Sequence, residues 1–122
     1  MVDGKAGNAL GAERIVPRHH FEARVKIEIK RGQEIVSTEG WARDLSESGM
    51  GAFVGFEMFV GEHTTLRIPL SRHVELVVPA TVTRNLGTEY GFQFTALSGP
   101  QRDHIRKALA ASKVIPYVPD SY

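Results

Sequence analysis

The sequence predicts an all-β fold, namely a six-stranded antiparallel β-barrel with one C-terminal α-helix. Six short segments have the alternating or β-branched pattern of strands, and short turns rather than helices join them. After the last of these segments, the spacing of the apolar residues changes to that of an amphipathic helix. Successive strands followed by one helix are typical of an antiparallel barrel or sandwich, and the helix is expected to cover one open end of the barrel.

The first two predicted strands form a hairpin. Between Phe21 and Lys30, apolar residues alternate strictly with charged ones, which is the pattern of a strand with one buried face. A tight turn at 31–33 leads into a second strand over 34–43, in which Gly40 indicates a bulge. The apolar face of the first strand consists of Phe21, Ala23, Val25, Ile27 and Ile29.

Four further segments complete the predicted barrel. Each is rich in β-branched or aromatic residues and is bounded by glycine or other turn-forming residues. Proline removes a backbone donor, so Pro69 and Pro79 are expected at a strand end, an edge or a bulge. The four segments are 50–56, 64–70, 75–84 and 89–95.

One helix follows the strands. Ser98 and Gln101 have the spacing of a capping box, in which each side chain bonds the backbone N–H of the other residue. Pro100 fits the first helical turn, where its missing N–H is harmless. The apolar residues that follow have the i, i+3, i+4 spacing of an amphipathic helix of about three turns. They are Ile105, Ala108 and Leu109.

The 122 residues are expected to form a single domain with one hydrophobic core. Residues 1–12 are rich in glycine and alanine without periodicity and are predicted to be a disordered lead. The domain spans 13–112 and begins with an extended, mobile arm at 13–20, where Pro17 disfavours helix. Residues 113–122 contain two prolines and are predicted to form a tail on the surface.

The composition argues against several functional classes. The net charge of +1 gives no general attraction to nucleic acids or anionic membranes, although segment 14–31 has a local charge of +4. The chain has no cysteine, which excludes disulfides and cysteine-based zinc sites. No apolar run approaches the ~20 residues that span a bilayer, and the N-terminus lacks a secretory signal. We therefore predict a cytoplasmic protein without membrane association.

The sequence gives no support for enzymatic activity or for a bound cofactor. None of the five histidines has the helical i, i+4 spacing of a zinc site, and His19 and His20 are expected to be solvated. No nucleophile elbow, phosphate-binding loop or dinucleotide-binding motif is present. Ser46 and Ser48 lie near Asp44 without a histidine nearby in sequence, although a triad can be assembled through space. We predict that the protein is not an enzyme and binds no metal or cofactor.

The polar turn between the second and third predicted strands is the first candidate binding site. It contains the pattern D-x-S-x-x-G, formed by Asp44, Ser46 and Gly49. The carboxylate can accept hydrogen bonds from paired N–H donors such as those of a guanine edge, and the serine can donate or accept. Glycine permits a positive φ and a close backbone approach. All three residues are also good turn formers, so the motif alone favours turn chemistry over ligand binding.

The N-terminal arm carries the second candidate site. Arg14 and Arg18 form an R-x-x-x-R pair. A guanidinium group binds phosphate with two parallel hydrogen bonds and stacks on flat bases. Two arginines on a mobile arm could therefore fold over an anionic nucleotide, and the simpler alternative is a solvated basic segment.

Together, the two motifs resemble those of the PilZ domain family in their order and spacing. The resemblance covers roughly residues 13–112 and includes Pro17 directly before Arg18. It implies a six-stranded barrel that binds the bacterial second messenger cyclic di-GMP without catalysing a reaction. Such a receptor domain acts on an effector protein, which the sequence does not identify.

The resemblance also implies a role for each residue of the two motifs. Arg14 and Arg18 would grip the phosphates and stack on guanine. Asp44 would hold a guanine edge, Ser46 would contact a base or a phosphate, and Gly49 would keep the turn open. These five residues form the predicted cyclic di-GMP site.

One position departs from the family pattern. Many relatives have a further arginine directly before the R-x-x-x-R pair, which favours binding of an intercalated ligand dimer, whereas this chain has Glu13. An acid there would repel a second dinucleotide. The sequence therefore leaves open whether one or two ligand molecules bind.

Three functional hypotheses follow from the sequence. The first is a cyclic di-GMP receptor that orders its arm on binding and changes a protein-interaction surface. The second is a PilZ-like adaptor that has lost nucleotide binding, for which Glu13 is the motivation. The third is a small barrel that binds nucleic acid through 14–31, against which the scarcity of aromatic residues there and the low net charge argue.

Overall fold

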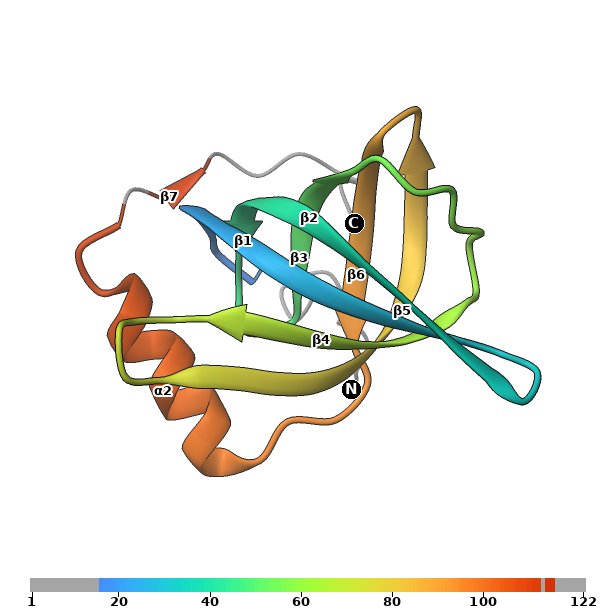
Figure 1. The fold of residues 1–122 in the computed structure, drawn as a ribbon. Coiled ribbons are helices and arrows are strands. Elements are labelled where there is room, and N and C mark those ends of the chain that lie inside the picture. The colour runs from blue at the N-terminus through green and yellow to red at the C-terminus, as the bar shows by residue number, and fades with distance from the viewer. Residues whose placement is uncertain (1–15, 113, 116–122) are drawn as a thin grey trace, which may run out of the picture.

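The computed structural model describes residues 16–112 and 114–115. Within these ranges the chain forms six main strands, one helix and a short additional strand (Figure 1). The elements are β1 (Arg18–Arg31), β2 (Glu34–Leu45), β3 (Gly49–Val54), β4 (His63–Pro69), β5 (Glu75–Leu86), β6 (Glu89–Phe94), α2 (Gly99–Leu109) and β7 (Val114–Ile115).

The six main strands close into an antiparallel barrel. They pair in the order β2, β3, β6, β5, β4, β1, and β1 also pairs with β2, so that the ring closes. The long strand β1 makes this closure possible because its residues 26–29 pair with β4 as well as with β2. Closure removes the free sheet edges that would otherwise invite pairing with another chain. The predicted fold class, an all-β barrel of six strands with one helix, is confirmed.

The core lies inside the barrel and is built from the inward-facing residue of each alternating pair. On β1, Val25 and Ile27 are fully buried, while Arg24 and Lys26 between and beside them are exposed. Phe92 of β6 is the largest fully buried side chain among the described residues. Burial of this apolar face is the main favourable term for folding, and the period-two pattern of the sequence predicts which side chains contribute to it.

Helix α2 covers one end of the barrel, next to the turn that joins β4 and β5 (Figure 1). Its capping box is complete, because Ser98 and Gln101 each accept a hydrogen bond from the backbone N–H of the other. Gln101 Nε2 also donates to the Val77 carbonyl of β5 at 2.9 Å. Ile105 and Leu109 are buried against the core, as the spacing predicts. No helix within residues 16–112 and 114–115 is long and apolar enough to cross a membrane.

Strand β1 begins earlier than the sequence predicts. Strand β1 begins at Arg18 rather than Phe21, because Arg18 and His19 pair with β7, and His19 and His20 pair with the end of β2. Residues 114–115, which were expected in a surface tail, therefore form a strand against the barrel. The lead predicted over 1–12 lies outside the described residues.

Glycine and proline positions within the strands reflect close packing and pairing. Gly40 was expected at a bulge, but the register runs through it without a shift. A Cβ atom there would lie 2.8 Å from the Phe53 carbonyl oxygen and 2.9 Å from a Val54 methyl group, so the close approach of β3 requires glycine. Pro69 ends β4, and Pro79 lies just before the part of β5 that pairs with β6.

Candidate functional site

The two sequence motifs meet in an ion pair between the start of β1 and the end of β2. Arg18 Nη2 donates to Asp44 Oδ2 at 2.8 Å, and Arg18 Nε donates to Asp44 Oδ1 at 3.3 Å, although 26 positions separate them in sequence. Both side chains are largely covered, with 17% of the arginine and 8% of the aspartate exposed. A bidentate, desolvated pair is considerably stronger than an exposed one. The structure therefore joins the arginine motif to the aspartate motif.

Three β-bulges surround this pair. The strand registers shift at 20–23 in β1, at 42–44 in β2 and at 82–84 in β5. A bulge inserts an unpaired residue, bends the strand and turns side chains in new directions. In β2, the bulge lets the adjacent residues Arg43 and Asp44 line the same cleft on the outside of the barrel. Strict alternation would have placed them on opposite faces.

The cleft beside the ion pair is narrow. Its volume is about 50 Å³, room for a few water molecules and too little for a nucleotide base. The Arg18 side chain reaches across to Asp44, and a Cβ atom at Gly51 would lie 2.7 Å from Asp44 Oδ2, so the carboxylate rests directly on this glycine. The residues that line the cleft are Arg18, Arg43, Asp44, Gly51, Ala52, Arg84, Glu89 and Tyr90.

Positive charge exceeds negative charge in the cleft. Three arginines and two acids line it. Arg43 Nη1 donates to Glu89 Oε2 at 2.7 Å, and its guanidinium group lies over the Phe53 ring, 4.7 Å from the centroid. These contacts hold Arg43 against the cleft wall. The lining can recognise an anionic ligand, and it presents a carboxylate for a ligand that also carries N–H donors.

Ser46 and Gly49 shape the turn that follows β2. The Ser46 hydroxyl oxygen accepts hydrogen bonds from the backbone N–H groups of Ser48 and Gly49 at 3.0 and 3.2 Å, and its side chain is fully buried. A Cβ atom at Gly49 would clash with the Phe92 carbonyl oxygen of β6. The described glycines with positive φ are Gly32, Gly61 and Gly87, so Gly49 serves strand packing rather than a left-handed turn. A ligand contact by Ser46 or Gly49 stays a prediction.

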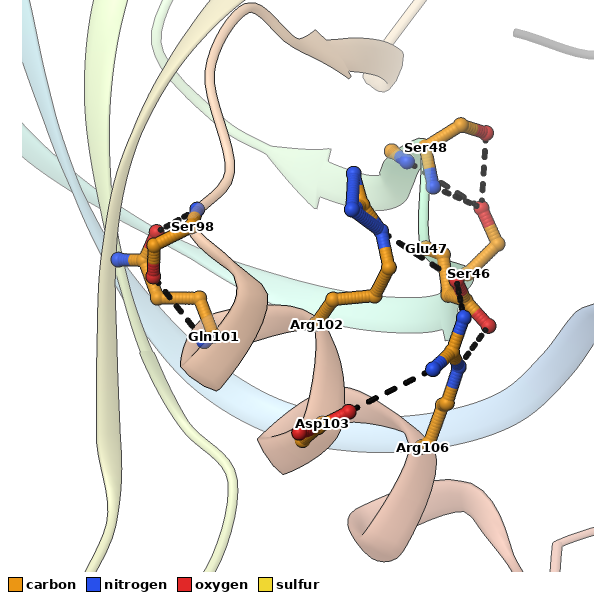
Figure 2. Close-up of polar contacts among 9 residues, drawn as sticks. Ser46, Glu47, Ser48, Ser98, Gln101, Arg102, Asp103 and Arg106 are labelled. Carbon is orange, nitrogen blue, oxygen red and sulfur yellow. Dashed lines mark hydrogen bonds and ion pairs between the residues drawn. The ribbon is translucent and has the colours of Figure 1, made fainter.

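Glu47 ties this turn to helix α2. Figure 2 shows its carboxylate beside two arginines of the helix: Arg106 donates to it at 2.9 and 3.2 Å, and Arg102 Nε lies at 3.6 Å. Asp103 contacts Arg106 at 3.4 Å. The hydrogen bonds to Glu47 raise the pKa of Arg106 above its ordinary value. A displacement of the turn would therefore move Glu47 and disturb its ion pairs with helix α2.

The structure brings two of the predicted site residues together beside the cleft, and the far side of the cleft was not predicted. Arg18 and Asp44 come together, while Arg14 lies outside the described residues. Arg84 of β5 and Glu89 of β6 line the cleft but were not predicted, because they belong to no local motif. Only the barrel closure and the bulge of β5 bring them to the two motifs.

The histidines do not form a metal centre within the described ranges. No group of three histidine, aspartate or glutamate side chains in residues 16–112 and 114–115 is placed to hold a metal ion. His19, expected to be solvated, is half-buried, and its Nδ1 lies 3.3 Å from the Ser112 carbonyl oxygen. This histidine connects β1 to the segment after α2.

Comparison with known proteins places the chain in one family. The sequence profile of the PilZ domain matches residues 12–111. Among curated proteins, no sequence matches the chain.

Three solved structures share the fold. The PilZ domain of CeSA from a cellulose-synthesizing bacterium is 18% identical, with a TM-score of 0.54 over 75% of this chain and 95% of that one. The PilZ domain with c-di-GMP of YcgR from Escherichia coli is 14% identical, with a TM-score of 0.63 over 80% of this chain and 88% of that one. The Bacillus subtilis inhibitor of motility, MotI/DgrA, is 18% identical, with a TM-score of 0.55 over 80% of this chain and 52% of that one. The chain thus spans about half the length of MotI.

Proposed function

We propose that this chain, which belongs to the PilZ domain family, is a non-enzymatic receptor for the second messenger cyclic di-GMP. One observation carries the proposal. The two motifs that would form the ligand site in this family meet in the Arg18–Asp44 ion pair. The family is one of cyclic di-GMP-binding domains, and a structure of the similar YcgR domain is described with c-di-GMP.

The chemistry of the pair suits this ligand. A guanine base presents two adjacent N–H donors, and a carboxylate accepts such a pair in the way that Asp44 now accepts two N–H groups of Arg18. On binding, the guanine edge would replace the arginine at the carboxylate. The released guanidinium would then bind a ligand phosphate bidentately. Because the N–H donors of guanine replace those of the arginine, the carboxylate is never left buried without a hydrogen-bond partner, which would be costly.

Signal output would follow from the same exchange. Arg18 opens β1 and pairs with β7, so its movement would disturb this short strand. On the outer surface, Trp41 and Phe53 lie opposite each other on β2 and β3, 44% and 39% exposed, and Arg43 of the cleft covers the Phe53 ring. A ligand that shifts Arg43 would change this aromatic surface. We assign it to contact with an effector protein.

Isothermal titration calorimetry with cyclic di-GMP tests the proposal. The chain should give binding heat at micromolar ligand, and Arg18→Ala should weaken binding about tenfold or more, since charged hydrogen bonds contribute ~1.5–3 kcal/mol. Arg24→Ala is the matched control, because Arg24 lies on the same strand, is 73% exposed and does not line the cleft. Absence of heat with the unmodified chain would overturn the proposal. The fitted stoichiometry shows whether Glu13 permits a second molecule.

The alternative function is that of an adaptor that binds proteins but no nucleotide. The narrowness of the cleft favours it, because a permanent Arg18–Asp44 pair would keep a base out. In that case an NMR titration with cyclic di-GMP would leave the amide signals of both residues unmoved. A partner protein would still shift the signals of Trp41 and Phe53.

A further inference from the structure

Arg84 lies across the cleft from the Asp44 carboxylate. Four strands present one row of residues here: Asp44 of β2 is opposite Gly51 of β3, Gly51 is opposite Gly91 of β6, and Gly91 is opposite Arg84 of β5. Between the two charged side chains the row contains only glycines. Gly51 lines the cleft and Gly91 is buried beside it, so no side chain of this row stands between the acid on one side and the arginine on the other.

The bulge in β5 is what places Arg84 in this row. Val82 is fully buried in the core, and Asn85 donates to the Met58 carbonyl at 3.3 Å. The register shifts at 82–84, so that Arg84 comes opposite Gly91 and lines the same cleft as Asp44. Its side chain is half-buried. The arrangement needs a specific irregularity of the strand, which is often found beside binding sites.

The spacing of the row suits a purine base. Neighbouring strands lie about 4.8 Å apart, so three steps separate the backbones at Asp44 and Arg84 by ~14 Å. The two side chains reduce this gap from both sides. A base that lies over Gly51, the glycine that lines the cleft, would then meet the carboxylate with one edge and the guanidinium with another. Opening this space requires Arg18 to leave Asp44, which is the exchange proposed above.

The two side chains match the two hydrogen-bonding edges of guanine. Guanine carries N–H donors at N1 and N2, which a carboxylate accepts, and acceptors at O6 and N7, which arginine binds bidentately. Adenine has an amine donor in place of O6 and no N1–H donor. An acid and an arginine on opposite sides of the cleft therefore select guanine on both edges.

Arg43, the neighbouring arginine of the cleft wall, lies on the Glu89 side of the cleft. Its Nη1 pairs with Glu89 at 2.7 Å and its guanidinium covers Phe53. Arg18 would be needed at a phosphate once the base displaces it from Asp44. By position, Arg84 is the arginine that faces the far edge of a base held by the carboxylate.

We propose that Arg84 is a specificity-determining residue that reads the O6 and N7 edge of the guanine held by Asp44. This inference rests on the proposed binding of cyclic di-GMP and names a contact that neither sequence motif contains. It predicts that the chain discriminates between bases through two side chains from opposite sides of the cleft.

The test is a cycle of calorimetric titrations that pairs a protein change with a ligand change. The ligands are cyclic di-GMP and its 7-deazaguanine analogue, which lacks the N7 acceptor. The proteins are the unmodified chain, Arg84→Ala, Arg84→Lys and Arg72→Ala. Arg72 lies exposed in the turn between β4 and β5, outside the cleft, so its loss controls for charge.

The unmodified chain and Arg72→Ala should bind the analogue about tenfold or more weakly than cyclic di-GMP, as expected for a lost bidentate contact. Arg84→Ala should bind cyclic di-GMP weakly and show no further loss with the analogue. Arg84→Lys retains the charge without the planar fork and should also lose the discrimination. Unchanged melting temperatures would show that the variants fold.

Each other outcome is decisive. If Arg84→Ala and Arg84→Lys still discriminate against the analogue as the unmodified chain does, the assignment of Arg84 is wrong while binding of cyclic di-GMP stands. If the unmodified chain binds both ligands equally, N7 is not read and the assignment is also wrong. If the unmodified chain does not bind cyclic di-GMP at all, both this inference and the proposed function are overturned.

Discussion

Strand β1 carries a bidentate arginine–carboxylate pair at each end, and the two pairs have different surroundings. At its start, Arg18 donates to Asp44 at 2.8 and 3.3 Å. At its end, Arg31 donates to Glu62 at 2.7 and 2.9 Å. Each pair joins β1 to a segment that is distant in sequence. The two have nearly the same hydrogen-bond geometry, so their different roles must come from their neighbours.

The neighbours of the Arg31–Glu62 pair fix a loop in place. Arg31 also donates to the Glu57 carbonyl at 2.9 Å and lies near the rings of Phe56 and Phe59, 5.2 and 5.7 Å from their centroids. Glu62 also accepts from the Phe59 backbone N–H at 2.9 Å. The contacts of Arg31 hold the loop between β3 and β4 against the end of β1, and the Phe59–Glu62 hydrogen bond fixes the loop itself. A ligand would have to break all of them to reach this carboxylate.

The neighbours of the Arg18–Asp44 pair border a cleft instead. Asp44 rests on Gly51, and the pair borders a cleft that Arg43 and Arg84 also line. A carboxylate beside a glycine floor can exchange one donor for another without rebuilding a loop. The comparison teaches that the groups around an ion pair, here further charged residues and a glycine, make it a candidate for ligand binding. Geometry of the pair alone does not distinguish the two cases.

The largest expected effect separates the two pairs by function. Asp44→Asn should weaken cyclic di-GMP binding about a hundredfold, because the amide replaces one acceptor by a donor and removes the charge that holds a guanine edge. Glu62→Gln makes the same chemical change at the other end of β1 and should leave binding unchanged. Calorimetric titration of both variants measures the difference.

This comparison would fail in one of two ways. Equal binding by both variants and the unmodified chain would show that the carboxylate of Asp44 does not contact the ligand. Equal loss in both would show that binding depends on the intact fold and not on the cleft. A melting curve of each variant separates loss of the site from loss of the structure.

The next largest effect concerns two glycines on the outer face of β3. A Cβ atom at Gly49 would clash with the backbone of β6, whereas one at Gly51 would press on the Asp44 carboxylate. Gly49→Ala should therefore destabilise the fold by about 3 kcal/mol through overpacking of two paired strands. Gly51→Ala should displace the carboxylate, which weakens cyclic di-GMP binding about tenfold with a smaller loss of stability. Urea denaturation and calorimetry measure the two effects.

The opposite assignment of effects would break this part of the argument. If Gly51→Ala left ligand binding intact, the carboxylate would not need its place on the glycine. If Gly49→Ala kept full stability and lost only ligand binding, Gly49 would act as the family resemblance implies, by keeping the turn open for the ligand.

The fold could be predicted from the sequence because each signal for it is local. The alternation from Phe21 to Lys30 predicts the buried face of β1, and the spacing of Ser98 and Gln101 predicts the helix start. The start of β1 was misjudged, since Arg18 is in a strand only because residues 114–115 return to pair with it. Pairing between distant segments leaves no local mark in the sequence.

The site could be predicted in part for the same reason. Asp44 stands in a recognisable motif, and Arg18 in another, so their meeting was expected. Ser46 and Gly49 belong to the same motif as Asp44. In the structure, Ser46 contacts the backbone of its own turn, and Gly49 packs against β6. Arg84 belongs to no motif, and only the bulge of β5 turns it toward the cleft. Bulges depend on how strands from distant parts of the chain fit together.

The smallest expected effect tests the structural role of the Arg31–Glu62 pair through pH. The hydrogen bond from Arg31 lowers the pKa of Glu62 below its ordinary value, so the unfolded chain takes up a proton at Glu62 before the folded chain does. This contribution to stability is full above the pKa of the unfolded state and is lost as pH falls through the lowered folded value. Glu62→Gln should therefore be slightly less stable than the unmodified chain at neutral pH, and the difference should shrink in acid. Urea denaturation from about pH 7 to about pH 3 measures this difference in the free energy of unfolding. If the difference stays constant with pH, packing of the glutamate, and not its charge, holds the loop.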